Sequence, residues 1–385
     1  MSEWKEYKLG DIADVKGGKR LPKGELLVNY ETPHPYIRIT DLGEKWIRKA
    51  GLQFVPSEIQ KNISRYIVNS GDVILSIVGS IGFVGRIPQE LNGANLTENC
   101  VKFLTNKKII DNDFLYYFLL SSIGQEEINK RNVGSTQPKL PLYNIKDVDI
   151  SLPPLPEQRA IASILSSLDD KIDLLHRQNA TLEKMAETLF RQWFVEEAKE
   201  EWEEGNLGEV IEIYDKLRIP LSKMERDKKK DGPLYPYYGA AQIMDYINEY
   251  IFDGEYILLG EDGTVRTDEG YPVLQYATGK FWVNNHTHVI KAKHPYNNFF
   301  ILNYLKKKNI DEIVTGAVQP KINQANLKSI DFPKYPENLV IEFNTVTNPV
   351  FNKIKHNITQ IRTLTALRDV LLPKLMSGEV RVDQD

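Results

Sequence analysis

Two short segments of the chain have nearly the same sequence. Gly134-Ser-Thr-Gln-Pro-Lys-Leu140 recurs 182 residues further on as Gly316-Ala-Val-Gln-Pro-Lys-Ile322. At the same shift Asn144-Ile-Lys146 matches Asn326-Leu-Lys328. Upstream, Leu9-Gly-Asp-Ile12 matches Leu207-Gly-Glu-Val210 at a shift of 198. Matches that keep their order over this much of a chain are typical of an internal repeat, so the sequence predicts one fold used twice.

The stretches between these matched frames differ. Gly71-Asp-Val-Ile-Leu75 resembles Gly254-Glu-Tyr-Ile-Leu258, but little else agrees, and the second copy is 16 residues shorter between its landmarks. Shared frames around divergent middles indicate one fold that binds two different things. The patterns at residues 66–78, 99–104, 256–259 and 286–292 predict strands, and those at 113–129 and 297–308 predict helices.

A run of heptads follows each frame. The first seam begins after the breaker cluster at 153–156 and contains one polar residue, Asn179, which is the kind that fixes the register of a coiled coil at some cost in stability. Asn357 and Arg368 interrupt the second seam, and Asn348-Pro349 reads as a helix start or a kink within it. The seam residues are Ile161, Leu168, Leu175, Asn179, Leu182 and Leu189 in the first copy and Ile354, Ile361, Leu364, Leu371 and Leu375 in the second.

Two apolar seams in one chain can cover each other. A long amphipathic helix cannot bury its stripe alone, and a repeat with a pseudo-twofold axis would lay the two helices antiparallel. The alternative is that each helix packs on its own globular unit. We expect a mixed α/β protein with two similar globular units, residues 1–155 and 201–335, and two long helices, residues 156–200 and 336–385, that form an antiparallel coiled coil.

Composition narrows the class of protein. The chain has 385 residues, 41% of them hydrophobic and 26% charged, which is typical of folded domains. No apolar run approaches the roughly 20 residues of a membrane span, and a single cysteine excludes a disulfide framework. We expect a cytoplasmic protein without a membrane partner. The net charge is −4, but residues 156–204 alone carry 6 basic against 12 acidic residues, so the globular units are nearly balanced.

Motifs for catalysis are missing from the sequence. It has no Gly-x-x-x-x-Gly-Lys-Ser/Thr loop for a nucleotide. Asn348-Pro-Val-Phe351 only superficially resembles the motif of amino-methylases, and it falls within the heptads. His286-Thr-His288 has no third ligand nearby in the sequence. We therefore predict a protein that is not an enzyme and that holds neither a metal nor a cofactor of its own.

The sequence does contain residues that are candidates for binding DNA. Cations gather near the start of both units, which suits loops that approach phosphates, and in the second unit they precede tyrosines and an amide able to contact base edges. The alternative is that any one cluster is only solvated surface. The candidates for DNA binding are Lys16, Lys19, Arg20, Lys23, Arg38, Lys45 and Arg48 in the first unit, Lys216, Arg218, Lys223, Tyr237, Tyr238 and Gln242 in the second, and Gln137, Lys139, Gln319 and Lys321 in the repeated frames.

These strings together resemble the specificity subunits of type I restriction-modification systems. Leu152-Pro-Pro-Leu-Pro-Glu-Gln-Arg-Ala-Ile161, which runs into the heptads, resembles their central region, as do the two Gly-x-x-Gln-Pro-Lys frames. Tyr237-Tyr-Gly239 and the segment 254–262 resemble one class of target-recognition domain. The resemblance covers essentially the whole chain.

The resemblance implies a DNA reader without catalytic activity. Each globular unit would be a target-recognition domain for one half of a split, asymmetric target in double-stranded DNA, and the helices would set the spacer. Two methylation subunits using S-adenosylmethionine would bind this scaffold, and restriction subunits using ATP and Mg²⁺ would join the complex. Two alternatives stay open: a coiled-coil scaffold for proteins without DNA reading, and the recognition arm of another type of restriction-methylation enzyme.

Overall fold

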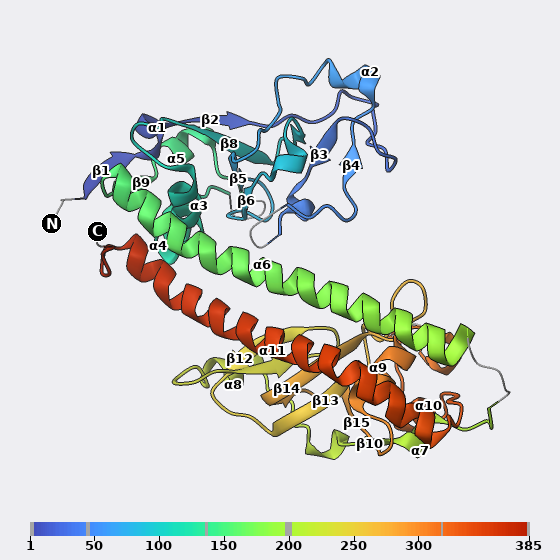
Figure 1. Cartoon of the computed structure of the whole chain (residues 1–385). Coiled ribbons are helices and arrows are strands. Elements are labelled where there is room, and N and C mark those ends of the chain that lie inside the picture. Colours follow the sequence, from blue (N-terminus) through green and yellow to red (C-terminus); the bar gives the residue numbers. More distant parts are fainter. Residues whose placement is uncertain (1–3, 44–46, 135–137, 197–201, 317–318, 383–385) are drawn as a thin grey trace. The chain divides into compact units, whose positions relative to one another are not determined.

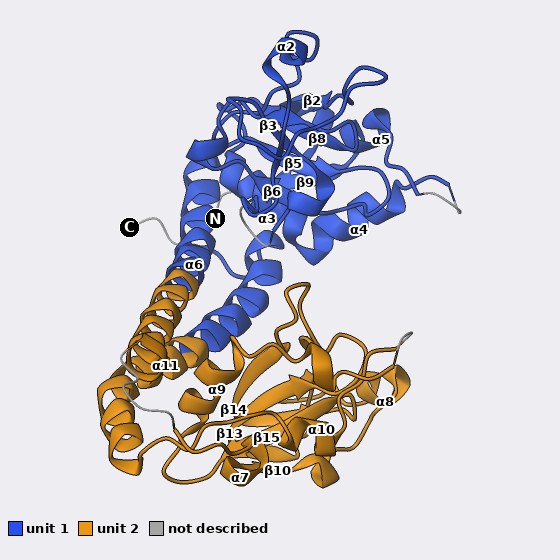
Figure 2. Cartoon of the chain, turned by 90° about the vertical axis from the view of Figure 1, so that its right-hand side faces the viewer, with its two compact units in different colours: residues 1–174, 360–385 blue, residues 175–359 orange. Residues whose placement is uncertain are grey.

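The structure is a computed structural model that describes residues 4–43, 47–134, 138–196, 202–316 and 319–382. The chain forms two compact units, residues 1–174 with 360–385 (unit 1) and residues 175–359 (unit 2), coloured separately in Figure 2. Two long helices, α6 (Leu155–Arg191) and α11 (Glu337–Met376), are labelled in Figure 1, and Figure 2 shows that each contributes one part to either unit.

Unit 1 contains a four-stranded sheet in the order β2-β8-β5-β6, a three-stranded sheet β4-β3-β7 and the pair β1-β9. Its strands are β1 (Lys5–Lys8), β2 (Ala13–Gly17), β3 (Pro35–Ile37), β4 (Gln53–Phe54), β5 (Val73–Ser76), β6 (Val84–Arg86), β7 (Asn95–Leu96), β8 (Cys100–Thr105) and β9 (Asp149–Leu152). Its shorter helices are α1 (Leu9–Ile12), η1 (Ile39–Asp41), α2 (Ser57–Gln60), η2 (Gln89–Leu91), α3 (Asn112–Leu120), α4 (Ser122–Lys130) and α5 (Leu142–Lys146).

Two predictions for unit 1 were wrong in their bounds. The strand expected over 66–78 is only β5, because the backbone before Val73 turns and makes single bonds to the segment around Ala94. The helix expected over 113–129 is two helices, α3 and α4, which meet at Ser121. The Ser121 hydroxyl accepts from the backbone N–H of Gly124 and so caps α4. An extended backbone at this serine ends α3 at the same place.

Unit 2 is built around a six-stranded sheet in the order β10-β15-β13-β14-β11-β12. Its strands are β10 (Ile211–Ile213), β11 (Tyr235–Tyr238), β12 (Ile243–Ile247), β13 (Phe252–Gly260), β14 (Leu274–Val283) and β15 (Thr287–Ala292). Its helices besides the long ones are η3 (Gln192–Glu196), α7 (Leu207–Val210), η4 (Asp215–Leu217), α8 (Lys223–Asp227), α9 (Asn298–Leu305), η5 (Asp311–Ile313) and α10 (Gln324–Lys328).

The internal repeat is confirmed by the sheet topology. The order β2-β8-β5-β6 in unit 1 is matched by β10-β15-β13-β14 in unit 2, and every neighbouring pair in both sets is antiparallel. The central strands β5 and β13 end in the runs Val73-Ile-Leu-Ser76 and Ile257-Leu-Leu-Gly260, which are buried throughout. Strands buried on both faces read as continuous apolar runs, which is why the two segments look alike. The pairing with β8 and β15 makes Leu75 correspond to Leu259, so the match of Leu75 with Leu258 drawn from the sequence was wrong by one residue.

The seams of the long helices lie in cores that also include the globular units. In unit 1, Ile161 and Leu165 of α6 share a core with Leu375 of α11, and Leu371 packs against it. In unit 2, Ala186 of α6 shares a core with Ile354 of α11, and Leu182 packs against it. The same cores contain residues of the sheets and short helices, so the packing on the globular units that we weighed as the alternative is present as well.

The polar residues of the two seams all bond to polar side chains of the opposite helix. In unit 2, Asn357 Nδ2 donates to Asn179 Oδ1 over 2.8 Å, with both side chains buried. In unit 1, Arg368 donates to the buried Asp169 over 3.1 Å, and Tyr117 of α3 donates to the same carboxylate over 2.7 Å. Burial, followed by the charge of Asp169, raises the pKa of Tyr117, so the hydroxyl keeps its proton and donates. From Asp169 to Asn179 the residue numbers rise along α6, while those of their partners fall along α11 from Arg368 to Asn357. The two helices are therefore antiparallel.

The start of α6 is joined to the rest of unit 1 by polar contacts, and α11 starts earlier in the sequence than expected. Glu157 at the start of α6 is buried and pairs with Arg381, whose Nε lies 2.6 Å from its Oε1. Gln158 donates to the carbonyls of Ile109 and Pro153, both over 2.9 Å, and so joins α6 to the globular part of unit 1. Helix α11 starts at Glu337, well before Asn348-Pro349, so the interpretation of that dipeptide as a helix start was wrong.

Candidate nucleic-acid interface

The repeated Gly-x-x-Gln-Pro-Lys frames lie at the ends of the central strands. In unit 1, Lys139 bridges to Val78 just beyond β5, and the next N–H, of Leu140, donates to Ile77 O over 2.9 Å. In unit 2, Lys321 bridges to Asp262 just beyond β13, and Ile322 N–H donates to Glu261 O over 2.8 Å. The two lysines thus occupy equivalent places, and both are exposed.

The basic segment after β2 reaches the same end of the sheet in unit 1. Gly18 N–H donates to Cys100 O over 3.0 Å and Lys19 N–H donates to Leu96 O over 2.8 Å. A Cβ atom on Gly18 would lie 2.1 Å from the carbonyl oxygen of Thr97, so only glycine fits there. This close approach places Arg20 beside Glu98, with 2.7 Å between Nε and Oε1, while 79% of the arginine side chain stays exposed.

Unit 2 places Arg218 at the position that corresponds to Arg20, but holds it differently. Its Nη1 donates to Glu261 Oε2 and to the carbonyl of Thr287, both over 2.6 Å, and only 11% of the side chain is exposed. Gly263 N–H donates to Pro320 O over 3.0 Å and so ties the turn after β13 to the second frame.

The hairpin between β11 and β12 borders this end of the sheet in unit 2. Its tip is closed by Gly239 N–H, which donates to Gln242 O over 2.9 Å, and Gln275 Nε2 donates to Gly239 O over the same distance. A Cβ atom on Gly260 would lie 3.3 Å from Ala240 O, so the tip lies directly against the end of β13.

We call these converging loops the strand-end surface of each unit. It consists of Lys19, Arg20, Asn99 and Lys139 in unit 1, and of Arg218, Gln242, Gln319 and Lys321 in unit 2. Beside the surface of unit 1 is a hollow of about 640 Å³, which Arg20, Tyr36, Arg38, Gln53, Glu98 and Asn99 help to line. Cations next to amide side chains in a concavity can hold phosphates and hydrogen-bond to base edges.

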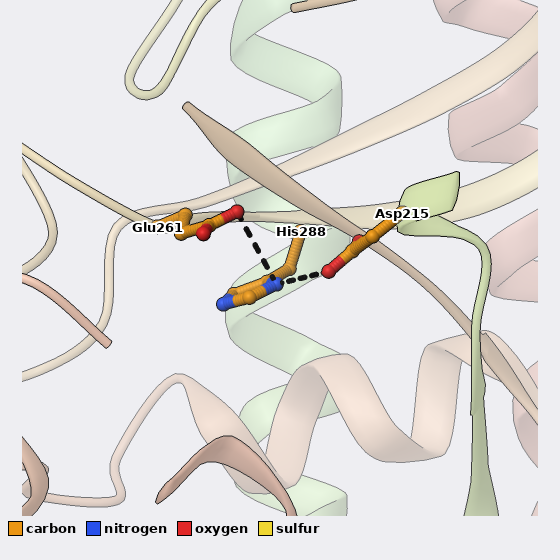
Figure 3. Close-up of side chains that lie close together, drawn as sticks. All are labelled: Asp215, Glu261 and His288. Atoms are coloured by element: carbon orange, nitrogen blue, oxygen red, sulfur yellow. Dashed lines mark hydrogen bonds and ion pairs between the residues drawn. The ribbon is translucent and has the colours of Figure 1, made fainter. Parts of the chain in front are cut away.

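A buried cluster of titratable side chains lies beneath the surface of unit 2. Figure 3 shows His288 between Asp215 and Glu261: its Nδ1 is 2.6 Å from Asp215 Oδ2 and 3.8 Å from Glu261 Oε2. The three residues lie close enough together to hold a metal ion. His288 Nε2, however, faces the carbonyl oxygen of Ile322 at 2.8 Å. The imidazole thus lies between the Asp215 carboxylate and the Ile322 carbonyl, within hydrogen-bonding distance of both, and links η4 to the second frame.

The charges in this cluster balance locally. Arg218 pairs with Glu261 and lies 3.5 Å from Asp215, and Lys321 Nζ lies 3.6 Å from Glu261 Oε1. Burial alone would raise the pKa of Asp215, but hydrogen bonds from His288 and from the N–H of Val289, with the positive charges of His288 and Arg218, lower it below its ordinary value. These ion pairs and hydrogen bonds link the end of β13 to β15, to η4 and to the second frame.

The candidates chosen from the sequence have different exposures. The exposed ones are Lys16, Lys19, Arg20, Lys23, Arg48, Lys139, Lys216, Lys223, Gln242, Gln319 and Lys321. Arg38 and Arg218 are half-buried in ion pairs, Arg38 with Asp41 over 2.8 Å. Lys45 and Gln137 lie outside the described residues. The surface charge is also partly neutralised, because Lys16 pairs with Asp14 over 2.7 Å.

Two candidates are buried, which contradicts their selection as base-contacting residues. The Tyr237 hydroxyl accepts from Leu221 N–H over 2.9 Å, and the ring of Tyr238 packs edge-on against Phe281 with 5.6 Å between centroids. Both side chains are used to hold the sheet together. Sequence reasoning also missed Asp215 and Glu261. The sequence does contain a signal for Asp215. At the shift of 198 this aspartate stands where the first unit has Gly17, and it is an acidic residue within a basic segment.

Comparison with known proteins agrees with this architecture. The sequence model of the type I restriction modification DNA specificity domain matches residues 1–184 and 199–337. The MjaIX specificity subunit of a type I restriction enzyme from Methanocaldococcus jannaschii is 26% identical over 424 residues, which cover 99% of this chain and 94% of that protein. A putative type I specificity subunit from Haemophilus influenzae is 37% identical over 147 residues, 38% of this chain and 36% of that one.

One solved structure supports the fold. The S subunit of a type I restriction-modification system from M. genitalium aligns with a TM-score of 0.60 and 19% identity, covering 100% of this chain and 97% of that one. Among the described residues, no helix combines the length and apolar character needed to cross a membrane. Since the family's sequence model matches both repeats and most of the chain, this protein belongs to the family of type I restriction modification DNA specificity domains.

Proposed function

We propose that this chain is the DNA-recognition subunit of a type I restriction-modification complex and reads a split, asymmetric target. Each unit reads one half of the target with its strand-end surface. The observation that carries this proposal is that one framework of strands and frames occurs twice, while the side chains around its end differ between the copies. A framework that stays the same and presents different side chains suits the reading of two unrelated short sequences.

The chain supplies recognition, and the chemistry comes from other subunits. The proposed partners are two methylation subunits, which use S-adenosylmethionine, and restriction subunits, which use ATP and Mg²⁺, acting on DNA in the cytoplasm. No cofactor is assigned to this chain itself. The long helices connect the two readers, and their length sets the number of unread base pairs between the half-sites.

A methylation map of a genome, made with and without this chain, tests the proposal. We expect modified bases at one bipartite sequence only when the chain is present together with its methylation subunits. Replacing residues 205–320 with the corresponding segment of a relative then changes one half of that sequence and leaves the other half intact.

Two results would count against this function. If both halves change in the chimaera, or neither does, the units are not independent readers. If the chain has no effect on the map, and duplex DNA shows no salt-dependent binding to the complex, the chain is a coiled-coil scaffold for proteins. Methyl transfer by the isolated chain would contradict its assignment as a subunit without catalytic activity.

A further inference from the structure

The buried charges of unit 2 hold the frame that carries Lys321. Asp215 accepts from Val289 N–H at Oδ1 over 2.9 Å and from Gln324 Nε2 at Oδ2 over 2.7 Å. The fully buried His288 bonds to Asp215 on one side and to the carbonyl of Ile322 on the other. The residue directly after Lys321 is therefore held through His288 by its C=O and through Glu261 by its N–H.

Unit 1 builds the same place from apolar residues. Val101 pairs with Leu75 in the sheet as His288 pairs with Leu259, so these two positions correspond. Ile77 accepts the backbone bond of the first frame as Glu261 accepts that of the second. Gly17 corresponds to Asp215 at the shift of 198. Val101 is completely buried and Ile77 packs against the same core, so the first frame is held by apolar packing.

The two units also differ in how far their corresponding arginines, Arg20 and Arg218, are exposed. Arg20 keeps 79% of its side chain exposed, whereas Arg218 is drawn inward by Glu261 and Asp215 and keeps 11%. Half of the Lys321 side chain is exposed, with its Nζ 3.6 Å from Glu261. In unit 2 the network thus takes Arg218 out of solvent and leaves Lys321 as the cation that it presents at the strand end.

We propose that Asp215 and His288 are positioning residues for DNA recognition by unit 2. They fix the frame so that Lys321 meets a phosphate and Gln319 lies beside the bases of one half-site, while the corresponding frame of unit 1, held by apolar packing, presents Lys139 without Asp215 or His288. This inference rests on the proposed function. It goes further in naming two buried residues that determine the recognition of one half-site and not of the other.

The test uses the complex of this chain with its methylation subunits and a duplex carrying the mapped target. In two further duplexes, one or the other of the half-sites is scrambled. Affinities are measured by fluorescence anisotropy over a series of salt concentrations for the wild type, Asp215→Asn and His288→Gln. We expect both variants to lose about tenfold of the discrimination against a scrambled half read by unit 2, the size of effect that one base contact gives. Discrimination in the other half should not change.

The salt series separates positioning from mere loss of folded protein. A smaller folded fraction lowers the affinity by the same factor at every salt concentration. Loss of one phosphate contact lowers the slope of log affinity against log salt by about 0.9. We expect that smaller slope in both variants, and no further decrease when Lys321→Ala is added to Asp215→Asn.

A matched control is Asp253→Asn, the same chemical change at an exposed aspartate near the start of β13, away from Glu261. It should bind like the wild type. If the buried variants do not fold, Gln324→Ala replaces them. Its side chain is exposed and gives Asp215 only one bond, so the same changes are expected at a smaller size.

The outcomes are distinguishable. Folded variants that keep the discrimination and the salt slope of the wild type overturn this inference, as does an equal loss in both half-sites. A wild-type complex that ignores both scrambled duplexes overturns the proposed function instead.

Discussion

Asn357 on α11 donates a hydrogen bond of 2.8 Å to Asn179 on α6, and both amides are buried in unit 2. Asn179 is the one polar residue among the seam positions of α6, and Asn357 is one of two, with Arg368, in the seam of α11. A buried amide can be satisfied only where it meets its partner, so a shift of the helices by one turn would leave both amides unpaired. The pair therefore defines one register for the antiparallel helices at the expense of some stability.

Removing one member of this pair should destabilise the protein more than removing both. Asn357→Ala leaves the Asn179 carbonyl without a donor in an apolar seam, and we expect a loss of about 1–3 kcal/mol in the free energy of unfolding. The double variant Asn179→Leu with Asn357→Leu should melt at or above the wild-type temperature. Denaturant unfolding checks both. A double variant less stable than either single one would show that the pair is not merely a device for register.

Acid should weaken unit 2 through Asp215. Its pKa is lower in the folded protein than its ordinary value of 3.8. The carboxylate therefore stabilises the fold above about pH 4, and this contribution is lost as the pH falls from there through the lowered pKa. His288, Arg218, Gln324 and the N–H of Val289 all face this carboxylate.

Thermal unfolding at a series of pH values measures this contribution. Asp215→Asn should be less stable than the wild type at pH 7, and the difference should shrink between about pH 4 and pH 2. A constant difference over that range would mean that the charge of Asp215 does not matter. Asp253→Asn, a change at an exposed aspartate, should follow the wild-type curve.

Lys139 and Lys321 should make equivalent contacts with the DNA backbone. Each stands at the end of a central strand in its own unit and is exposed. We expect Lys139→Ala and Lys321→Ala each to reduce the salt slope of binding by about 0.9 and to weaken binding to all sequences alike. Lys184→Ala on an exposed position of α6 serves as the control. A change in base preference with an unchanged salt slope would assign these lysines to bases instead.

Gln242 and Tyr238 should respond differently to substitution, although only four residues separate them. Gln242 is exposed at the tip of the β11–β12 hairpin, so Gln242→Ala should alter discrimination at one base pair by about 1–3 kcal/mol without affecting the melting temperature. Tyr238 is packed in the core, and Tyr238→Ala should lower the free energy of unfolding by about 3–5 kcal/mol. Methylation maps and melting curves of the two variants compare these effects directly.

The helices should determine the gap between the half-sites. Adding one heptad after Leu174 and another after Ile361 keeps Asn179 opposite Asn357 and Asp169 opposite Arg368. It lengthens both helices by about 10.5 Å, or near three base pairs at 3.4 Å each. The methylation map should show a longer gap between unchanged half-sites. A heptad added to α6 alone should destabilise the protein, and an unchanged gap in the double insertion would assign the spacing to something else.

Much of the fold could be predicted because it depends on periodic patterns. The heptads predict two helices, and the polar residues Asn179, Asn357 and Arg368 stand out in them, since a pattern of period seven shows every exception. Their partners follow only from the antiparallel register. The break at Ser121 was missed because the apolar residues of α3 and α4 form one helical pattern, and the serine ends it through a local cap.

The site was harder to predict, because composition does not report burial. Tyr237-Tyr238 read as a pair of hydrogen-bonding aromatics, yet β11 is an inner strand, with β14 on one side and β12 on the other. Arg218 read as a free cation, but Glu261, 43 residues away in the sequence, draws it inward. Only the three-dimensional register of β13 and β15 brings Asp215, Glu261 and His288 together.

Gly18 has a consequence for how such a protein can change its target over evolutionary time. The oxygen of Thr97 occupies the space that a side chain at this position would need, so the path of the basic loop is closed to most substitutions. Mutation can instead alter side chains at the rim, such as the exposed Arg20 or the partly exposed Asn99, while the loop keeps its course. A lineage can therefore acquire a new recognition sequence by a few surface changes, without altering the helices that its partner subunits would bind.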